Sequence, residues 1–251
     1  MPSLPIIIDA LAPIFLNQVA YTLYTSIIAY ALILFFMRPQ RFYFVRHGET
    51  ILNAQRIRQG EDGALSETGK YQAEQVGQYL KNFPIKSIIS STYPRARETA
   101  IIIATYLKTP IIYSSLLVER RNPSEIIGKS TRDPDVVRIV DQMDLAYHDD
   151  EYRFSDEENF IDLKKRAREC LNFLARQRAH EIVVVTHHLF LKMLVAYFLY
   201  HERLHAADFV KLTFFNTSDN AGITVCEFHP WKMFSKTRGW EVVSYNEQPE
   251  L

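Results

Sequence analysis

The chain has 251 residues, of which 47% are hydrophobic and 23% charged, so it can bury a sizeable core in one domain or in one domain with an appendage. Its 29 basic and 29 acidic residues cancel, which excludes the basic excess that binding along a nucleic acid requires. The two cysteines, Cys170 and Cys226, lie far apart and show no metal-binding spacing. We therefore expect reduced thiols in the core, as in a protein of a reducing compartment.

The first 37 residues form an apolar segment. Residues 18–37 (QVAYTLYTSIIAYALILFFM) carry no charge, and 20 such residues are enough to cross a bilayer. Because Arg38 and Arg41 follow, we expect a membrane anchor that leaves the rest of the chain in the cytoplasm. Two alternatives stay open. The polar residues and tyrosines also fit a helix that packs on a partner or on a membrane surface, and the reading frame could extend beyond a true start at Met37.

From residue 41 onward, strand-like and helix-like segments alternate. Short apolar runs bounded by polar residues predict buried parallel strands at 41–45, 86–91 and 181–187. Amphipathic patterns with N-terminal capping signals predict helices within 65–83, 94–107 and 156–177. Three C-terminal segments, 209–215, 222–228 and 240–246, are expected to finish the sheet as strands. The pattern predicts a three-layer α/β/α sandwich with a mostly parallel central sheet, preceded by an N-terminal hydrophobic helix.

Basic residues and histidines stand at the carboxyl ends of the predicted strands. Arg46 and His47 follow the first strand, Arg95 the second, and His187 and His188 the third. In open α/β sheets, ligands bind outside these strand ends. Guanidinium groups bind phosphate oxygens bidentately and keep their charge. The sequence therefore predicts a pocket that selects a phosphoryl group.

Several segments, in this order, resemble the motifs of the histidine phosphatase superfamily, which has the phosphoglycerate mutase-like fold. They are RHGETILN, ALSETGKYQA, SSTYPRARETA, LLVERRNPSEIIG, VVVTHHLFLKML and NAGITVCEF. The resemblance covers residues 42–227 and favours the phosphatase branch. It implies a catalytic domain over residues 38–251, with a cap or lid over residues 120–157.

The resemblance implies a phosphomonoester hydrolase that works through a covalent phosphohistidine. His47 would be the nucleophile, and Glu119 would serve as general acid and then as general base. The phosphoryl group would be held by Arg46, Asn53, Arg95 and His187. No metal or other cofactor is implied. Two neighbouring residues are weaker candidates for these roles: Arg97 for phosphate binding and Glu125 for the acid.

Gly48, Thr50 and His188 are candidate residues of the substrate pocket. Gly48 leaves room for close backbone approach to a ligand beside the nucleophile. His188 stands where many relatives have glycine, so its side chain could line the pocket or pack against the following helix. A metal site at the adjacent histidines is disfavoured because no third ligand is evident.

The resemblance leaves the reaction and the substrate open. Mutases of this family carry Glu-Arg-His-Tyr-Gly around the acid, whereas here Arg121, Asn122 and Pro123 follow Glu119-Arg120, which favours hydrolysis. The alternatives are a phosphoglycerate mutase and a membrane-tethered module that binds a phosphorylated ligand without activity. The acidic run HDDEYRFSDEE in the expected lid opposes a large polyanion. We expect a small phosphorylated metabolite or a phosphoprotein side chain as the substrate.

Overall fold

The computed structural model describes residues 18, 20–31, 37–146, 148–215, 218–232 and 239–249, without the side chains of residues 213–215. The chain divides into two units, Met1–Arg38 and Pro39–Leu251. In the first unit, residues 20–31 are helical and exposed. None of the helices in the described ranges is both long and apolar enough to cross a membrane. The predicted anchor gains no support from them, and residues 19 and 32–36 of it lie outside the described residues.

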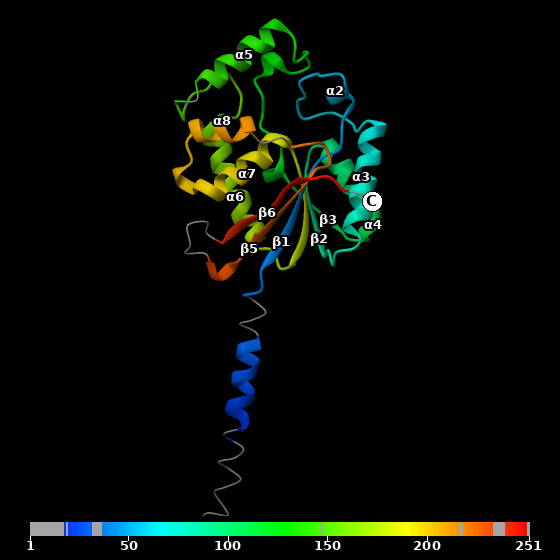
Figure 1. The fold of residues 1–251 in the computed structure, drawn as a ribbon, viewed down its shortest axis with the longest axis vertical. Coiled ribbons are helices and arrows are strands. Elements are labelled where there is room, and N and C mark those ends of the chain that lie inside the picture. The colour runs from blue at the N-terminus through cyan, green and yellow to red at the C-terminus, as the bar shows by residue number, and fades with distance from the viewer. Residues whose placement is uncertain are drawn as a thin grey trace, which may run out of the picture. The chain divides into compact units, whose positions relative to one another are not determined.

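The second unit is built around a six-stranded sheet with the order β3-β2-β4-β1-β5-β6 (Figure 1). Its strands are β1 (Gln40–Arg46), β2 (Ser87–Ser91), β3 (Ile111–Ser114), β4 (Glu181–Thr186), β5 (Ile223–Phe228) and β6 (Trp240–Glu247). The first four are parallel to one another, β5 pairs with β1 in the antiparallel direction, and β6 pairs with β5 in the antiparallel direction. The strands predicted at the beginning of the domain and around residue 184 are thus neighbours in the sheet.

Helices cover both faces of the sheet. One layer holds α3 (Glu67–Leu80) and α4 (Pro94–Leu107), and the other holds α6 (Phe160–Ala175) and α7 (His188–Tyr200) (Figure 1). The predicted starts are confirmed: the Ser66 side chain caps α3 by accepting a 3.0 Å hydrogen bond from the Gly69 N–H, and Pro94 opens α4. This is the predicted α/β fold, with a mixed sheet between two helical layers.

The side chains of β1 alternate between two hydrophobic clusters. Phe42 and Phe44 belong to the cluster under α6 and α7, and Tyr43 and Val45 belong to the cluster under α3 and α4. A strand buried on both faces needs apolar side chains at successive positions, which explains the unbroken run in the sequence. Both cysteines are buried free thiols, as predicted, and burial raises the pKa of Cys170 to about 12.

The prediction of a strand at residues 209–215 is wrong. This segment lies in the helix α8 (Ala206–Phe215). Phe209 packs against Phe160 of α6, with ring centroids 6.1 Å apart, and Leu212 packs on the same hydrophobic cluster. Positions 209 and 212 share one helical face, so tertiary packing overrides the β preference of an aromatic-rich run. The strands predicted at 222–228 and 240–246 are confirmed as β5 and β6.

Residues 120–157, the predicted lid, form what we call the cap segment. It contains the short helix η2 (Ser124–Ile126) and α5 (Pro134–Leu145), while residue 147 lies outside the described residues. Ile126, Val136 and Ile139 form a small hydrophobic cluster separate from the two main ones. The remaining short helices are α2 (Ile51–Ala54), η1 (Ser115–Leu117), η3 (His201–Arg203) and η4 (Pro230–Lys232).

Candidate active site

The histidines predicted at two strand ends meet at one edge of the sheet. Arg46 and Thr186 are register partners at the ends of β1 and β4, so the next residues, His47 and His187, are neighbours. Their ring centroids lie 5.1 Å apart, and both side chains are buried. Arg95, in the first turn of α4 after β2, is also buried. The sheet thus gathers the residues that the sequence placed at three separate strand ends.

His47 is held in one tautomer by the backbone. Its ring Nδ1 atom lies 2.7 Å from the Gly48 carbonyl oxygen, and the backbone N–H of His47 donates to the Thr186 carbonyl at 3.0 Å. A carbonyl only accepts, so Nδ1 carries the ring proton and Nε2 keeps its lone pair. Burial, reinforced by the charges of Arg95 and Arg46, lowers the pKa of His47 well below its usual value. The ring is therefore neutral at pH 7, as a nucleophilic imidazole must be.

Hydrogen bonds to the surrounding protein hold the side chains of Arg46, Arg95 and His187. The Arg46 Nη1 group donates to the Ser218 carbonyl, and His187 Nε2 lies 2.8 Å from Ser91 Oγ. Arg95 Nη1 lies 3.1 Å from each of three successive carbonyls, those of residues 60–62. These contacts hold the three side chains in place.

Three nitrogen atoms of these anchored groups have no partner. Arg46 Nε, Arg95 Nε and His187 Nδ1 are buried and make no hydrogen bond among the residues described. Leaving a buried donor unpaired costs about 1–3 kcal/mol, and more for a charged group. Such groups gathered around a neutral imidazole form a site that favours an anion with several oxygen atoms.

Glu119 reaches the same site from the loop after η1. Its carboxylate accepts hydrogen bonds from the N–H groups of Arg120 at 2.9 Å, Leu189 at 3.1 Å and Phe190 at 3.0 Å. The last two belong to the first turn of α7, whose dipole favours a negative charge there. Glu125, the alternative acid, is instead exposed and accepts from the Ser155 hydroxyl at 3.0 Å.

Thr50 supports Asn53 and does not offer a free hydroxyl to a pocket. The Asn53 N–H donates to Thr50 Oγ1 at 3.0 Å, and the Thr50 N–H donates to Asn53 Oδ1 at 3.3 Å, which together cap α2. The Thr50 hydroxyl is fully buried and also donates to Gln59 Oε1 at 2.9 Å. Because its carboxamide oxygen is used by Thr50, Asn53 keeps its Nδ2 group for another acceptor.

Gly48 has a structural role that the sequence did not show. A Cβ atom at this position would lie 2.4 Å from the Gly69 carbonyl oxygen, and a Cβ atom at Gly69 would lie 1.9 Å from the Glu49 carbonyl oxygen. The two backbones therefore touch where side chains would stand. The packing of this loop on α3 is enough to require glycine at position 48, and close approach of a ligand there stays a prediction.

His188 packs beside Arg46. Its Nδ1 atom lies 3.1 Å from the Ser218 carbonyl, which also accepts from Arg46. Burial, with the charges of Arg46 and Lys192, lowers the pKa of His188 to about 4, so the ring is neutral at pH 7. No group of three or more histidine, cysteine, aspartate or glutamate side chains suited to a metal ion occurs in the described ranges.

Sequence reasoning missed two residues near the site. Lys192, one turn after His188, is 9% exposed, and burial lowers its pKa. A single charge inside the apolar run of residues 188–200 was the available signal. Ser91, which bonds His187, is the last residue of β2, so the strand-end argument could have found it.

Comparison with known proteins decides the family. The model of the Histidine phosphatase superfamily (branch 1) matches residues 42–246. The chain belongs to this superfamily. A relative from Erwinia tasmaniensis, named probable phosphoglycerate mutase GpmB, is 52% identical over 63 residues, which are 25% of this chain and 29% of the relative. The Bacillus subtilis protein named uncharacterized phosphatase PhoE is 44% identical over 77 residues, 30% of this chain and 40% of its own length.

The matched stretches therefore span less than half of these curated relatives. Among solved structures, the mycobacterial glucosyl-3-phosphoglycerate phosphatase Rv2419c superposes with a TM-score of 0.65 over 83% of this chain and 99% of its own, at 24% identity. This likeness shows a shared fold.

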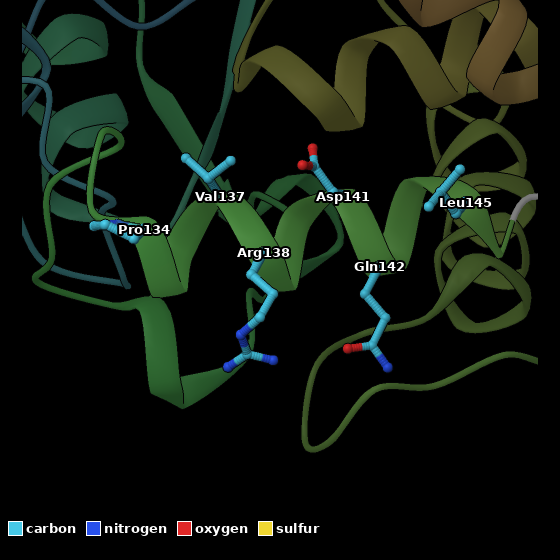
Figure 2. Close-up of a pocket in the computed structure, with 6 residues that line it drawn as sticks. All are labelled: Pro134, Val137, Arg138, Asp141, Gln142 and Leu145. Carbon is cyan, nitrogen blue, oxygen red and sulfur yellow. The ribbon is translucent and has the colours of Figure 1, made fainter.

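The hollows described for the histidine phosphatase fold of this chain lie away from the candidate catalytic residues. The hollow in Figure 2 lies along α5, and its lining comes from that helix alone; the residues are Pro134, Val137, Arg138, Asp141, Gln142 and Leu145. Another cavity, of about 110 Å³, lies between the cap segment, α6 and α8. Its lining includes Arg120 and Leu189 but none of the predicted catalytic or phosphate-binding residues.

Proposed function

We propose that this protein hydrolyses phosphomonoesters through a phosphohistidine formed on His47, with no metal ion. The observation that carries the proposal is the set of buried, unpartnered nitrogen atoms of Arg46, Arg95 and His187 around a neutral imidazole. A phosphoryl group would satisfy all of them with its oxygen atoms. Membership of the histidine phosphatase superfamily supports the same chemistry.

In the first step, the lone pair of His47 Nε2 attacks phosphorus in line with the ester oxygen. The new P–N bond forms as the P–O bond to the leaving group breaks. Arg46, Arg95 and His187 stabilise the charge on the equatorial oxygens, with the Asn53 amide as a further donor. Glu119 must enter this step protonated, and it gives its proton to the departing alkoxide, so the leaving group departs as a neutral alcohol. The three N–H groups that bind its carboxylate favour this transfer, because they stabilise the charged form that results.

In the second step, water opens the phosphohistidine. The Glu119 carboxylate accepts a proton from the attacking water as its oxygen bonds to phosphorus. The P–N bond then breaks, and its electron pair returns to His47 Nε2. Inorganic phosphate leaves, and both His47 and Glu119 regain their initial protonation states.

The test is hydrolysis of p-nitrophenyl phosphate in EDTA by the full chain. We expect His47→Asn to lower kcat by at least about 1,000-fold, the scale on which loss of a nucleophile acts. His205→Asn, which changes an exposed histidine of the same chain, is the matched control and should keep activity. An acid-labile, base-stable phosphoenzyme should form on the wild-type protein alone. Unchanged turnover by His47→Asn would refute the proposal.

Phosphoryl transfer between hydroxyl groups is the second candidate. The 52% identity of one stretch to a protein named probable phosphoglycerate mutase favours it. Transfer needs the same phosphohistidine, with a substrate hydroxyl in place of water. The two activities separate when 3-phosphoglycerate is supplied: hydrolysis releases phosphate, whereas a mutase forms 2-phosphoglycerate faster than it releases phosphate.

We propose a small phosphorylated metabolite as the substrate. The acidic run at residues 148–158, at the end of the cap segment, supports this choice because it opposes a large polyanion. The name of one structural neighbour, a glucosyl-3-phosphoglycerate phosphatase, is consistent with a small ester. The free thiols fit a reducing compartment, so we propose that the catalytic domain over residues 38–251 works in the cytoplasm. A screen of small phosphate esters, with phosphopeptides as the comparison, tests this choice.

A further inference from the structure

We propose that Arg166 is a positioning residue for the general acid, and that it joins the acid loop to the end of the cap segment. The proposal rests on the proposed role of Glu119. Arg166 lies in the second turn of α6. Among the described residues, its hydrogen bonds go to Glu158, Leu116 and Val118, and none goes to His47. Its charge contributes to lowering the pKa of His187, but no hydrogen bond of the described residues joins it to Glu119, so it positions Glu119 through the groups that it holds.

Arg166 hydrogen-bonds the backbone immediately before Glu119. Its Nη1 group donates to the carbonyl oxygens of Leu116 at 3.1 Å and of Val118 at 2.7 Å. The intervening carbonyl, that of Leu117, accepts a 2.9 Å hydrogen bond from the Thr186 hydroxyl. The carbonyl groups of the three residues before Glu119 are therefore hydrogen-bonded by side chains from α6 and β4.

Arg166 also forms an ion pair with Glu158, which directly follows the cap segment. Its Nε and Nη2 groups each donate to one oxygen of Glu158 at 2.6 Å, in a bidentate pair whose side chains are both 14% exposed. The Glu158 N–H donates to the Arg121 carbonyl at 3.0 Å, two residues after Glu119. One guanidinium thus supports the chain on both sides of the acid.

A third contact reaches the partners of the acid itself. The Arg166 guanidinium lies 4.0 Å from the centre of the Phe190 ring, and the Phe190 N–H donates to the Glu119 carboxylate. The carboxylate, the loop before it and the loop after it therefore share one support. Proton transfer depends on geometry first, and a misplacement of about 1 Å can lower a rate about 100-fold.

The experiment compares two substrates in each variant. The nitrophenolate of p-nitrophenyl phosphate is a weak base that leaves without a proton, whereas the alkoxide of glycerol 2-phosphate needs one. We expect Arg166→Met to lower kcat/KM, which reports the first step alone, about 10- to 100-fold on glycerol 2-phosphate, since general acid catalysis contributes about 100- to 10,000-fold. On p-nitrophenyl phosphate the loss in kcat/KM should stay below about threefold. Arg166→Lys, which restores a cation with fewer directed donors, should recover part of the loss.

Arg41→Met is the matched control. Arg41 also pairs with a carboxylate, that of Glu227, through Nε at 3.0 Å and through Nη2, but near the amino end of β1 and away from the site. Arg41→Met should leave the ratio of the activities on glycerol 2-phosphate and p-nitrophenyl phosphate unchanged. Glu158→Gln weakens the Arg166–Glu158 pair while keeping Arg166, so it should reproduce the selective loss on glycerol 2-phosphate. If Arg166→Met does not fold, this variant tests the proposal in its place.

Equal losses of kcat/KM on both substrates in the folded variants would overturn the proposal, because a merely structural residue affects both first steps alike. A failure of the proposed function looks different. In that case the wild-type protein itself would hydrolyse neither ester in a His47-dependent way.

Discussion

The two halves of the candidate site are built in different ways. The proposed phosphate-binding half stands at the ends of buried strands, where the register of β1 and β4 places His47 beside His187. The acid half, Glu119, lies in a loop whose position depends on contacts from α6, α7 and Glu158. The first half is fixed by the sheet, and the second by partners distant in sequence. A site can therefore be rigid where it holds charge and separately adjustable where it transfers protons.

The largest expected effect breaks the phosphate-binding half. Arg95→Met should lower kcat/KM about 1,000-fold, because it removes a preorganised cation from the transition state. Arg97→Met is the control on the same helix, since Arg97 is exposed and its guanidinium lies 4.4 Å from the centre of the Tyr113 ring. Steady-state kinetics with p-nitrophenyl phosphate measure both. Similar losses in the two variants would contradict the placement of Arg95 at the phosphate.

The next effect isolates the acid half. Glu119→Gln keeps the shape of the side chain but holds no transferable carboxyl proton, so kcat/KM on glycerol 2-phosphate should fall about 100- to 1,000-fold. The loss in kcat/KM on p-nitrophenyl phosphate should be much smaller, whereas kcat should fall on both esters because Glu119 is also the proposed base of the second step. Glu125→Gln is the matched control in the cap segment. If Glu125→Gln showed the selective loss and Glu119→Gln did not, the assignment of the acid would be wrong.

A substitution in the loop that follows His47 sharpens the contrast in stability. Gly48→Ala forces a methyl group to within 2.4 Å of the Gly69 carbonyl oxygen, so it should lower the free energy of unfolding by about 3 kcal/mol. Gly60→Ala is milder, because the nearest atom is a side-chain methyl of Ile127 at 3.2 Å. Urea unfolding compares the two variants. A fully stable Gly48→Ala protein would show that the loop after β1 is not locked onto α3.

The smallest effect concerns pH. Burial lowers the pKa of His47 and His187 well below the usual value, so both stay neutral in the folded state while the unfolded chain takes up protons below about pH 6.5. The unfolded state then binds more protons, and stability falls as pH decreases, by about 1.4 kcal/mol per pH unit for each histidine. Chemical denaturation between pH 7.5 and pH 5 should show a shallower slope in His47→Asn. An unaltered slope there and in His187→Asn would contradict their burial as neutral rings.

Local sequence signals predicted the parts of the molecule that local physics determines. The apolar run before Arg46, the capping serine at Ser66 and Pro94 at a helix start all appear as predicted. The family was also predicted from its motifs and is confirmed. The gathering of His47 and His187 followed from a general rule about strand ends. The catalytic roles of these residues stay predictions.

Long-range packing determined what the sequence could not show. Residues 209–215 have strand-like composition, yet Phe209 packs on α6 as part of a helix. Gly48 invited an explanation by ligand binding, and nothing local indicated that its neighbour is the Gly69 backbone, 21 positions away. The same holds for Arg166, whose partners at Leu116 and Val118 are separated from it by the whole cap segment. No local pattern reports contacts of this kind.

The separate hydrophobic cluster of the cap segment has a consequence for how such a protein can diversify. Ile126, Val136 and Ile139 pack with one another and not in either main cluster. A change in these side chains alters the local stability of the cap segment and leaves the packing of the sheet intact. New specificities can therefore arise by exchanging a module of one helix and its loops, while the inherited edge that carries His47 needs no redesign.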